Sequence, residues 1–293
     1  MRFLILFFKE MRPHQWVKNV FVFAPAVFAK EVMNVDIMKK SLVAAVAFSL
    51  VSSGVYVIND YFDRDKDRYH PKKRKRPIAS GQLPALPALL VALAMVGVTF
   101  VFLYLWNPFV FFVILAYFCL NVIYSAWLKD VPLLDIFLVA LGFDLREAAG
   151  GFASSLYMSP WMFVVTFLLA LFIAATKRRQ EIANLKEDAV LHREALSEYN
   201  LVFLDNLIAI VTASTLISYV IYTLSKDMQE RMISQHLYLT TPFVLYGILR
   251  YLYLVYVKGK GDDPMEIILK DFPFQLNLLF WALTVFVILY FGW

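Results

Sequence analysis

Charge is scarce in this chain. Only 17% of its 293 residues are Asp, Glu, Lys or Arg, whereas about a quarter are charged in a typical soluble domain. No charged side chain occurs between Pro77 and Leu128. That stretch is long enough for two helices that cross a bilayer, since each needs about 20 apolar residues. The low charge content therefore predicts an all-α, polytopic membrane protein.

Other absences narrow the class further. The single cysteine, Cys119, lies within an apolar run and excludes an internal disulfide. The apolar runs are continuous rather than alternating, which argues against a transmembrane β-barrel. The four histidines do not have the spacing of a metal cluster, and no Ser-His-Asp arrangement is visible. The net charge of +5 indicates basic loops that orient a membrane protein, and no nucleic-acid partner is expected.

The apolar runs predict nine membrane helices, and Lys18 and Pro25 interrupt the first of them. The ten residues before it, MRFLILFFKE, are expected to form an interfacial helix. No linker or short repeat divides the chain, so residues 1–293 are predicted to form one membrane domain. The predicted spans are roughly 16–34, 41–60, 84–105, 108–128, 132–154, 160–177, 200–224, 237–257 and 272–292.

Basic residues are distributed unevenly over this topology. If the N-terminus faces the cytoplasm, five of the 28 Lys and Arg residues lie on the outer side and 22 lie on the cytoplasmic side. Cytoplasmic loops of membrane proteins carry such an excess. The chain is therefore expected to lie in the inner (plasma) membrane. Its N-terminus and the charged loops at about 59–83 and 177–199 then face the cytoplasm, and its C-terminus lies outside.

The first charged stretch, NDYFDRDKDRYHPKKRKRP, starts at Asn59 directly after an apolar run. If the helix continues, Asp60, Asp63 and Asp67 lie within about 60° of one helical face. Asp65 lies roughly opposite Asp60. Three convergent carboxylates suit Mg²⁺, which prefers oxygen ligands and keeps waters and phosphate oxygens. The same acids could instead belong to a solvated loop and pair with neighbouring Arg and Lys side chains.

A basic run, Lys72 to Arg76, follows at once. It could act only as the positive-inside signal of a cytoplasmic loop. Lys73 and Arg76 are the stronger functional candidates, because nearby prolines constrain their backbone and their charges could clamp phosphate oxygens. Asn59 could add an amide oxygen. Metal-bound carboxylates that face a pyrophosphate would suit diphosphate as a leaving group.

The pattern of Asn59, Asp60, Asp63 and Asp67 matches NDxxDxxxD. It resembles the first aspartate-rich motif of the UbiA superfamily of intramembrane prenyltransferases. The resemblance implies nine membrane helices around a central cavity, Mg²⁺ as cofactor, and the three aspartates as catalytic metal ligands. Superfamily members typically carry a second motif, DxxxD, after the sixth helix. KRRQE, which begins at Lys177, stands at that place here.

One acidic and one basic motif suit a donor that carries a pyrophosphate and a further phosphate, such as phosphoribosyl pyrophosphate. RPHQWVKN, HPKKRKRPIASG, GFDLREAAGG and GDDPMEIILKD look like the decaprenyl-phosphate phosphoribosyltransferase branch of the superfamily. The resemblance implies transfer of 5-phosphoribose to a polyprenyl phosphate, as a step towards activated arabinose for cell-wall or surface glycans. Asp144 departs from the apolar residue expected in that branch.

The resemblance also implies roles in substrate binding. Arg12 and Lys18 are expected to share in binding substrate phosphate. The expected substrate-binding residues are Lys18, Asn59, Lys73, Arg76, Tyr124, Lys129, Arg146, Lys177, Arg178 and Glu181.

Each of these roles has an alternative. Lys18 could extend to the membrane interface, and Tyr124 and Lys129 are typical interfacial residues. Arg146 could instead belong to a buried network of ionised side chains. Glu181 could simply pair with a lysine one helical turn away.

Two other functions stay open from the sequence. A UbiA-type prenyl transfer to an aromatic acceptor lacks its second aspartate motif here. A non-enzymatic transporter or binding protein for lipid phosphates would not require three convergent carboxylates. The sequence also leaves a homo-oligomer open.

Overall fold

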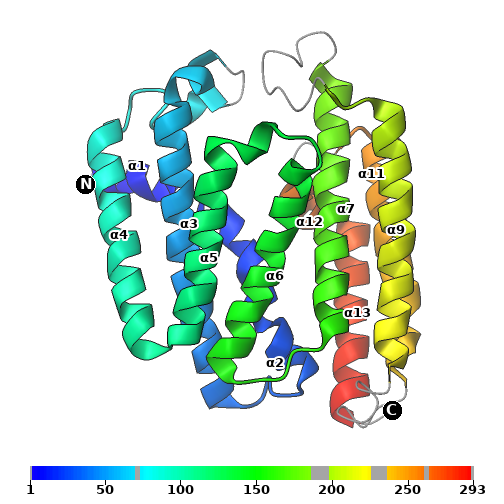
Figure 1. The fold of residues 1–293 in the computed structure, drawn as a ribbon. Helices are drawn as coiled ribbons and strands as arrows, with labels where there is room; N and C mark the ends of the chain where they lie inside the picture. The colour runs from blue at the N-terminus through cyan, green and yellow to red at the C-terminus, as the bar shows by residue number, and fades with distance from the viewer. Residues whose placement is uncertain (1, 70–72, 186–197, 226–235, 261–263, 292–293) are drawn as a thin grey trace. The chain divides into compact units, whose positions relative to one another are not determined.

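The structure is all-helical in the part of the chain that it describes (Figure 1). The computed structural model describes residues 2–69, 73–185, 198–225, 236–260 and 264–291, without the side chains of residues 185, 265 and 266. No strand occurs in these ranges, so the predicted all-α class is confirmed. Parts of the two predicted active-site loops, residues 70–72 and 186–197, lie outside the described residues.

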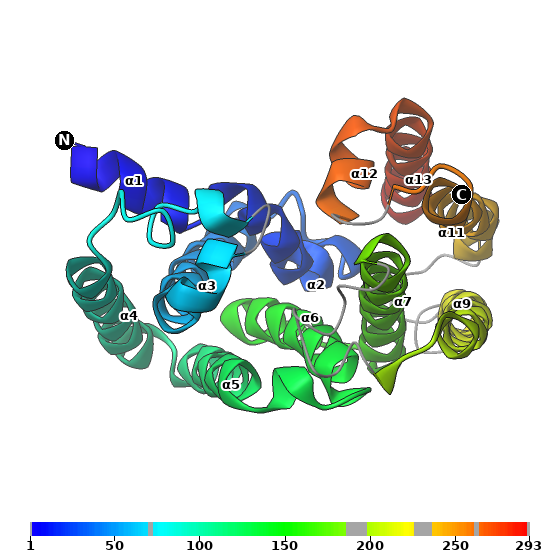
Figure 2. The ribbon, with the colours of Figure 1, turned by 90° about the horizontal axis from the view of Figure 1, so that it is seen from above.

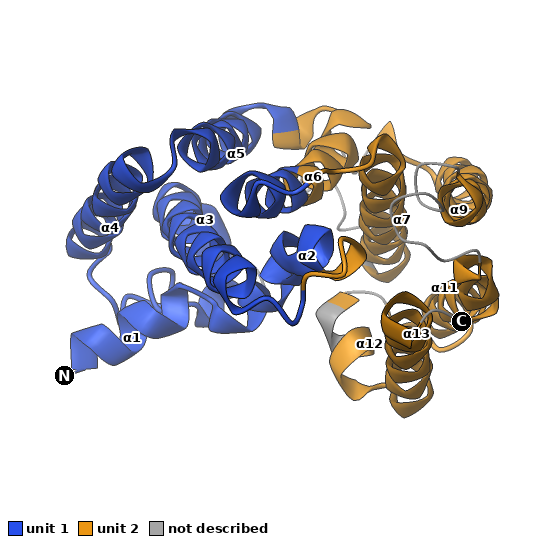
Figure 3. Ribbon diagram, turned by 90° about the horizontal axis from the view of Figure 1, so that it is seen from below, with its two compact units in different colours: residues 1–26, 32–128, 145–156 blue, residues 27–31, 129–144, 157–293 orange. Residues whose placement is uncertain are grey.

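The chain folds as two compact units (Figure 3). Unit 1 consists of Met1–Ala26, Val32–Leu128 and Leu145–Leu156, and unit 2 consists of Val27–Glu31, Lys129–Asp144 and Tyr157–Trp293. Two helices, α2 and α6, are divided between the units. The single membrane domain expected from the sequence stays a prediction.

Unit 1 is built around one very long helix. Its elements are α1 (Arg2–Glu10), the 3₁₀ segment η1 (Pro13–Phe23), α2 (Ala24–Phe28), α3 (Val35–Tyr69), η2 (Lys73–Lys75), α4 (Ala85–Trp106), α5 (Pro108–Ala126) and the second half of α6 (Leu134–Ser154). The 35 residues of α3 extend about 52 Å at 1.5 Å per residue, well beyond a hydrocarbon core of about 30 Å. The helix therefore carries its charged end past the apolar segment.

Small residues allow α3 to pack closely against its neighbours. A Cβ added at Gly54 would lie 2.3 Å from Cγ2 of Val96 on α4. Ser53 and Ala44 on the same helix are fully buried. By contrast, α1 runs crosswise to α3 and α4 (Figures 1 and 2). It exposes Leu4, Ile5 and other apolar side chains, as a helix at a membrane interface would.

The predicted first membrane helix, roughly 16–34, is wrong. The chain forms the 3₁₀ segment η1 and then the short α2 instead. Side chains on α3 hold this segment in place: Trp16 Nε1 donates to Ser53 Oγ at 3.0 Å, and Asn19 Nδ2 donates to Ser49 Oγ at 2.7 Å. The backbone of this segment also lies very close to Gly150 on α6, because a Cβ added at Gly150 would be 1.8 Å from the carbonyl oxygen of Val22. These contacts fix the backbone locally.

Unit 2 contains five further helices and part of α6. The five helices are α7 (Pro160–Leu185), α9 (Leu201–Leu224), α11 (Thr241–Tyr256), α12 (Pro264–Lys270) and α13 (Phe272–Phe291). The 3₁₀ segment η5 (Leu237–Thr240) precedes α11, and the residues of the 3₁₀ segment η3 (Leu128–Asp130) are divided between the two units. The bounds of α9, α11 and α13 agree with predicted spans to within a few residues, whereas α7 continues through KRRQE and α12 has no predicted counterpart.

The predicted number of nine membrane helices is not confirmed. In the described ranges, seven helices are long and apolar enough to cross a membrane. The predicted span 132–154 does coincide with α6, but this helix is not one of the seven, because Asp135, Asp144, Arg146 and Glu147 interrupt its apolar character. The chain is nevertheless a multi-pass membrane protein.

Candidate active site

The aspartates of the first charged stretch lie on the last turns of α3. Asp60 and Asp67 are buried, and Asp63 is half-buried. Asp65 faces away, with 70% of its side chain exposed, and pairs with Arg68 at 3.4 Å. The prediction that Asp60 and Asp67 lie on one face of the helix, with Asp65 on another, is therefore confirmed.

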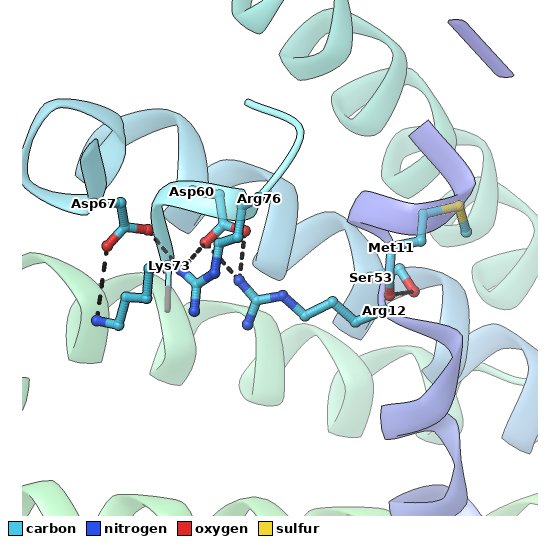
Figure 4. Close-up of polar contacts among 7 residues, drawn as sticks. All are labelled: Met11, Arg12, Ser53, Asp60, Asp67, Lys73 and Arg76. Atoms are coloured by element: carbon cyan, nitrogen blue, oxygen red, sulfur yellow. Dashed lines mark hydrogen bonds and ion pairs between the residues drawn. The ribbon is translucent and has the colours of Figure 1, made fainter. Parts of the chain in front are cut away.

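Two arginines from other segments converge on these buried carboxylates (Figure 4). Arg12 Nη2 donates to Asp60 Oδ1 at 2.6 Å and also contacts Oδ2. Arg76 Nη1 donates to both carboxylates, at 2.9 Å to Asp60 Oδ1 and 2.6 Å to Asp67 Oδ2. Lys73 Nζ lies 3.7 Å from Asp67 Oδ1. Two functional candidates from the basic run thus do pair with the acids.

The backbone around Arg76 explains why its side chain reaches the acids. Its amide donates to the carbonyl of Lys73 at 2.9 Å, and its carbonyl accepts from the amide of Ser80 at 2.8 Å. Ile78 and Leu83 follow and are buried in an apolar cluster with residues of α1 and α4. The loop is therefore folded tightly back onto α3.

Arg12 occupies a special backbone position between α1 and η1. Its φ of 54° lies in the left-handed region, which is uncommon for a residue other than glycine. The preceding carbonyl, of Met11, accepts from Ser53 Oγ at 3.0 Å (Figure 4). The Arg12 guanidinium lies 4.9 Å from the centre of the Tyr56 ring. These contacts direct Arg12 towards Asp60.

Glu10 is a member of this cluster that sequence reasoning missed. It lies at the end of α1 with only 1% of its surface exposed. Burial, and then the neighbouring Asp60 carboxylate, raise the pKa of Glu10 to about 8. The group is therefore mostly protonated at neutral pH and adds little negative charge. Its position at the end of the apolar run LILFF was the only signal in the sequence.

The donors at the end of α3 fit a divalent metal ion in part. In the described ranges, no group of three or more His, Cys, Asp and Glu side chains is arranged to hold a metal. One oxygen of Asp60 and one oxygen of Asp67, however, both lie within hydrogen-bond distance of the same nitrogen of Arg76. Carboxylate oxygens are the ligands that Mg²⁺ prefers. The structure thus brings together two of the three predicted ligands, and the role of Asp63 stays a prediction.

Arg146 is the buried basic residue of unit 1. Its Nε donates to Asn19 Oδ1 at 2.8 Å, and its Nη2 donates to the Tyr117 hydroxyl at 3.2 Å. Its guanidinium also lies 4.9 Å from the ring centres of Phe48 and Tyr117. Hydrogen bonds to Asn19 and Tyr117 and two aromatic rings therefore help to position this cation.

In unit 2, the KRRQE segment forms the last turns of α7. Arg178 is almost fully buried, and its Nε donates to Asp135 Oδ2 at 2.5 Å while its Nη1 contacts Glu181 Oε2. The Tyr199 hydroxyl donates to the other Asp135 oxygen at 2.8 Å. Arg178, expected to bind substrate, thus holds Glu181 in place. Asp135 was missed, because an acid in the first turn of a helix is common in any helix.

The remaining predicted residues lie at helix ends or in 3₁₀ segments. Lys177 is 44% exposed and lies 3.9 Å from Glu181, so the predicted pairing one turn apart is present. Lys18 lies in η1, Tyr124 near the end of α5 and Lys129 in η3, and all three are half-buried. Their roles in substrate binding stay predictions, as does that of Asn59.

The fold and the two charged helix ends define a class of protein. A multi-pass helical protein that gathers carboxylates and guanidiniums at the extended end of a membrane helix has the features of a membrane transferase for phosphate-bearing substrates. The chain belongs to the UbiA prenyltransferase family, whose sequence profile matches residues 19–199.

Relatives with full-length similarity point to one branch. The chain is 31% identical to the decaprenyl-phosphate phosphoribosyltransferase of Mycolicibacterium smegmatis, over 97% of this chain and 92% of the relative. It is 32% identical to the enzyme of the same name from Corynebacterium glutamicum, over 96% of this chain and 86% of the relative.

The fold itself has a solved counterpart. A UbiA homolog from Archaeoglobus fulgidus, solved bound to GPP and Mg²⁺, superposes with a TM-score of 0.73. The match covers 97% of this chain and 99% of that one, at 17% identity. This likeness establishes the UbiA fold.

Proposed function

We propose that the protein transfers 5-phosphoribose from phosphoribosyl pyrophosphate to a polyprenyl phosphate and releases pyrophosphate, in a reaction that depends on Mg²⁺. The observation that carries the proposal is the contrast between two helix ends. The end of α3 gathers buried carboxylates and guanidiniums, whereas α7 carries KRRQE where a prenyltransferase typically has a second acidic motif. The names of the full-length relatives support the same donor and acceptor.

The end of α3 would bind the pyrophosphate of the donor. A divalent ion held by Asp60 and Asp67 would neutralise part of the charge of that group. Arg12, Arg76 and Lys73 surround the same carboxylates and would contact phosphate oxygens. As the bond between C1 of the ribose and the pyrophosphate breaks, these cations would stabilise the departing anion.

The acceptor needs little activation. The phosphate of a polyprenyl phosphate is already an anion, so its oxygen can attack C1 without a strong general base. Attack from the face opposite to the leaving group would invert the anomeric centre. Arg146, positioned by Asn19 and Tyr117, would meet a substrate phosphate, and the surrounding apolar helices would keep water from competing as the nucleophile.

In unit 2, Lys177 would contact a substrate phosphate and Glu181 the hydroxyls of the ribose. The buried pair of Arg178 and Asp135 would set the orientation of Glu181. We also propose that the protein lies in the inner membrane with both charged loops in the cytoplasm, where phosphoribosyl pyrophosphate is soluble. Its product would serve as a precursor of activated arabinose for cell-wall or surface glycans.

The decisive experiment offers the purified protein two labelled donors in parallel. One reaction contains phosphoribosyl pyrophosphate labelled in the ribose, and the other contains prenyl diphosphate with an aromatic acceptor. Both contain Mg²⁺ and polyprenyl phosphate. Label that moves from phosphoribosyl pyrophosphate into the lipid fraction supports the proposal. Transfer from prenyl diphosphate alone, or no transfer with lipid binding intact, contradicts it.

A further inference from the structure

One nitrogen atom of Arg76 lies where the two buried carboxylates of α3 converge. Arg76 Nη1 is 2.9 Å from Asp60 Oδ1 and 2.6 Å from Asp67 Oδ2. A divalent ion bound by the same two oxygens would need them at about 2.0–2.1 Å. The ion and the Arg76 nitrogen therefore compete for one position, and both cannot be there together.

The cations paired with these carboxylates also leave no excess of negative charge. Asp60 and Asp67 carry two negative charges, and Arg12, Arg76 and Lys73, which pair with them, carry three positive charges. The two carboxylates are only 1% and 4% exposed, so their attraction for these arginines is weakly screened by solvent. A free metal ion that approaches this arrangement meets no net negative charge and no uncommitted oxygen of the bridged pair.

We propose that Arg76 is a substrate-dependent occupant of the metal position. In this proposal, which rests on the function proposed above, Arg76 keeps free metal ions out until a pyrophosphate group arrives. The pyrophosphate then offers the guanidinium several anionic oxygens, with which it forms strong, bidentate hydrogen bonds. Arg76 would then leave Asp60 and Asp67, and the oxygens of these two residues would hold the metal ion beside the pyrophosphate.

This exchange couples two binding events. Each ligand favours the state in which Arg76 has left the carboxylates, so each raises the affinity for the other by the same factor. Coupling of this kind typically amounts to about 5- to 150-fold in affinity. The consequence for the reaction is that the metal site is completed only on a chain that already holds a pyrophosphate.

Arg12 is not equivalent to Arg76 in this respect. Among the carboxylates of the described residues, it bonds only to Asp60, through both oxygens, and its guanidinium packs against the Tyr56 ring. It does not bridge to Asp67. Arg12 therefore orients one ligand, whereas Arg76 occupies the point that two ligands share.

The test measures metal binding without any phosphate compound. Mn²⁺ suits oxygen ligands as Mg²⁺ does and is paramagnetic, so free and bound ion can be distinguished by electron paramagnetic resonance. The full-length protein is titrated with Mn²⁺ alone. Arg76→Gln is compared with the unchanged chain and with Lys73→Gln, which removes an equal charge beside Asp67 without freeing the shared point.

We expect Arg76→Gln to bind Mn²⁺ about 10-fold more tightly than the unchanged chain, within the usual range of such coupling. Lys73→Gln is expected to change the Kd less than about threefold, because the Lys73 side chain is 32% exposed and its Nζ lies 3.7 Å from Asp67, beyond hydrogen-bond distance. Equal Kd values for the unchanged chain and Arg76→Gln would overturn the proposal. So would an equal gain in both variants, which would reflect charge alone.

The removal of Arg76 leaves two buried acids facing each other and can impair folding. Arg76→Gln is therefore also prepared with Mn²⁺ in every buffer. Recovery of folded protein only with Mn²⁺ supports the proposal, because the ion then replaces the guanidinium. Failure to fold both with and without Mn²⁺ contradicts it.

A further titration separates this proposal from the proposed function. The unchanged chain is titrated with Mn²⁺ in the presence of phosphoribosyl pyrophosphate, and ribosyl transfer is measured in parallel. Transfer without any gain of Mn²⁺ affinity in Arg76→Gln leaves the function standing and removes the role of Arg76. Absence of both transfer and Mn²⁺ binding in the presence of phosphoribosyl pyrophosphate refutes the function itself.

Discussion

The charged ends of α3 and α7 bury different groups. At the end of α3, the carboxylates are buried and the cations reach them from neighbouring segments while remaining about a quarter exposed. At the end of α7, the cation Arg178 and the acid Asp135 are both buried, and Glu181 is the partly exposed partner. The sign of a charged motif in the sequence therefore does not tell which of its charges are exposed.

The comparison predicts that substitutions at the end of α3 reduce activity and that substitutions at the end of α7 first reduce stability. The largest effect should follow a substitution on α3. Asp67→Asn removes one of two carboxylates that meet at the proposed metal position. We expect turnover to fall about 1,000-fold, since a catalytic metal contributes several kcal/mol. Ribosyl transfer measured at saturating Mg²⁺ tests this.

Asp65→Asn is the matched control, because Asp65 lies on the opposite face of the same helix and is 70% exposed. It should keep transfer within about twofold, as surface substitutions change little. Equal losses of ribosyl transfer in Asp67→Asn and Asp65→Asn would contradict the assignment of these two residues to different faces of α3.

At the end of α7, a change should act first on stability. Arg178→Met leaves the fully buried Asp135 without its cation, and breaking a buried pair costs about 3–5 kcal/mol. Thermal unfolding in detergent should show a large decrease in Tm. The double variant Arg178→Met with Asp135→Leu should recover much of it, because no buried charge is then left unpaired. A double variant as unstable as the single one would argue against the ion pair as the cause.

Lys177 offers the accessible counterpart to Arg178. It is 44% exposed, and its pairing with Glu181 at 3.9 Å is weak. Lys177→Gln should leave Tm unchanged and raise KM for phosphoribosyl pyrophosphate about 10-fold, the worth of one hydrogen bond to a charged group. Steady-state kinetics with kcat and KM separated will show this. A fall in kcat at unchanged KM would place Lys177 elsewhere in the reaction.

A further expected effect concerns Glu10 and the pH dependence of stability. Its pKa in the folded protein, about 8, is above the ordinary value of 4.5, so the folded state binds the proton more tightly than the unfolded state does. Stability should therefore fall as pH rises from about 5 to about 8 and level off above that range. Glu10→Gln cannot titrate, so this part of the pH dependence of Tm should disappear. An unchanged Tm profile in that variant would show that another group is responsible.

Local patterns in the sequence predicted much of this fold. The apolar runs located most helices, and the spacing of Asp60 and Asp67 predicted that they share a face, because both properties depend on periodicity within one helix. The segment 16–34 could not be predicted in this way. Its 3₁₀ conformation depends on hydrogen bonds to Ser49 and Ser53 and on the closeness of Gly150, none of which is adjacent in the sequence.

The same limit applies to the site. Lys73 and Arg76 follow the aspartates closely and were found. Asp135 was not, because its partner Arg178 is separated from it by 43 positions along the chain. Glu10 was missed for a similar reason, since only the fold places it beside Asp60. Long-range partners of buried charges are what a single sequence does not reveal.

The 3₁₀ conformation of η1 has a consequence for the distance between Arg12 and the position that holds Arg146. Arg12 stands at its start, and Asn19, which holds Arg146, lies seven residues further on. At about 2.0 Å per residue, this segment separates the two positions by about 14 Å, where an α-helix would give about 10 Å. The tighter winding thus makes η1 a longer spacer, and one inserted residue would shift Asn19 away from Arg146 while leaving Arg12 on Asp60.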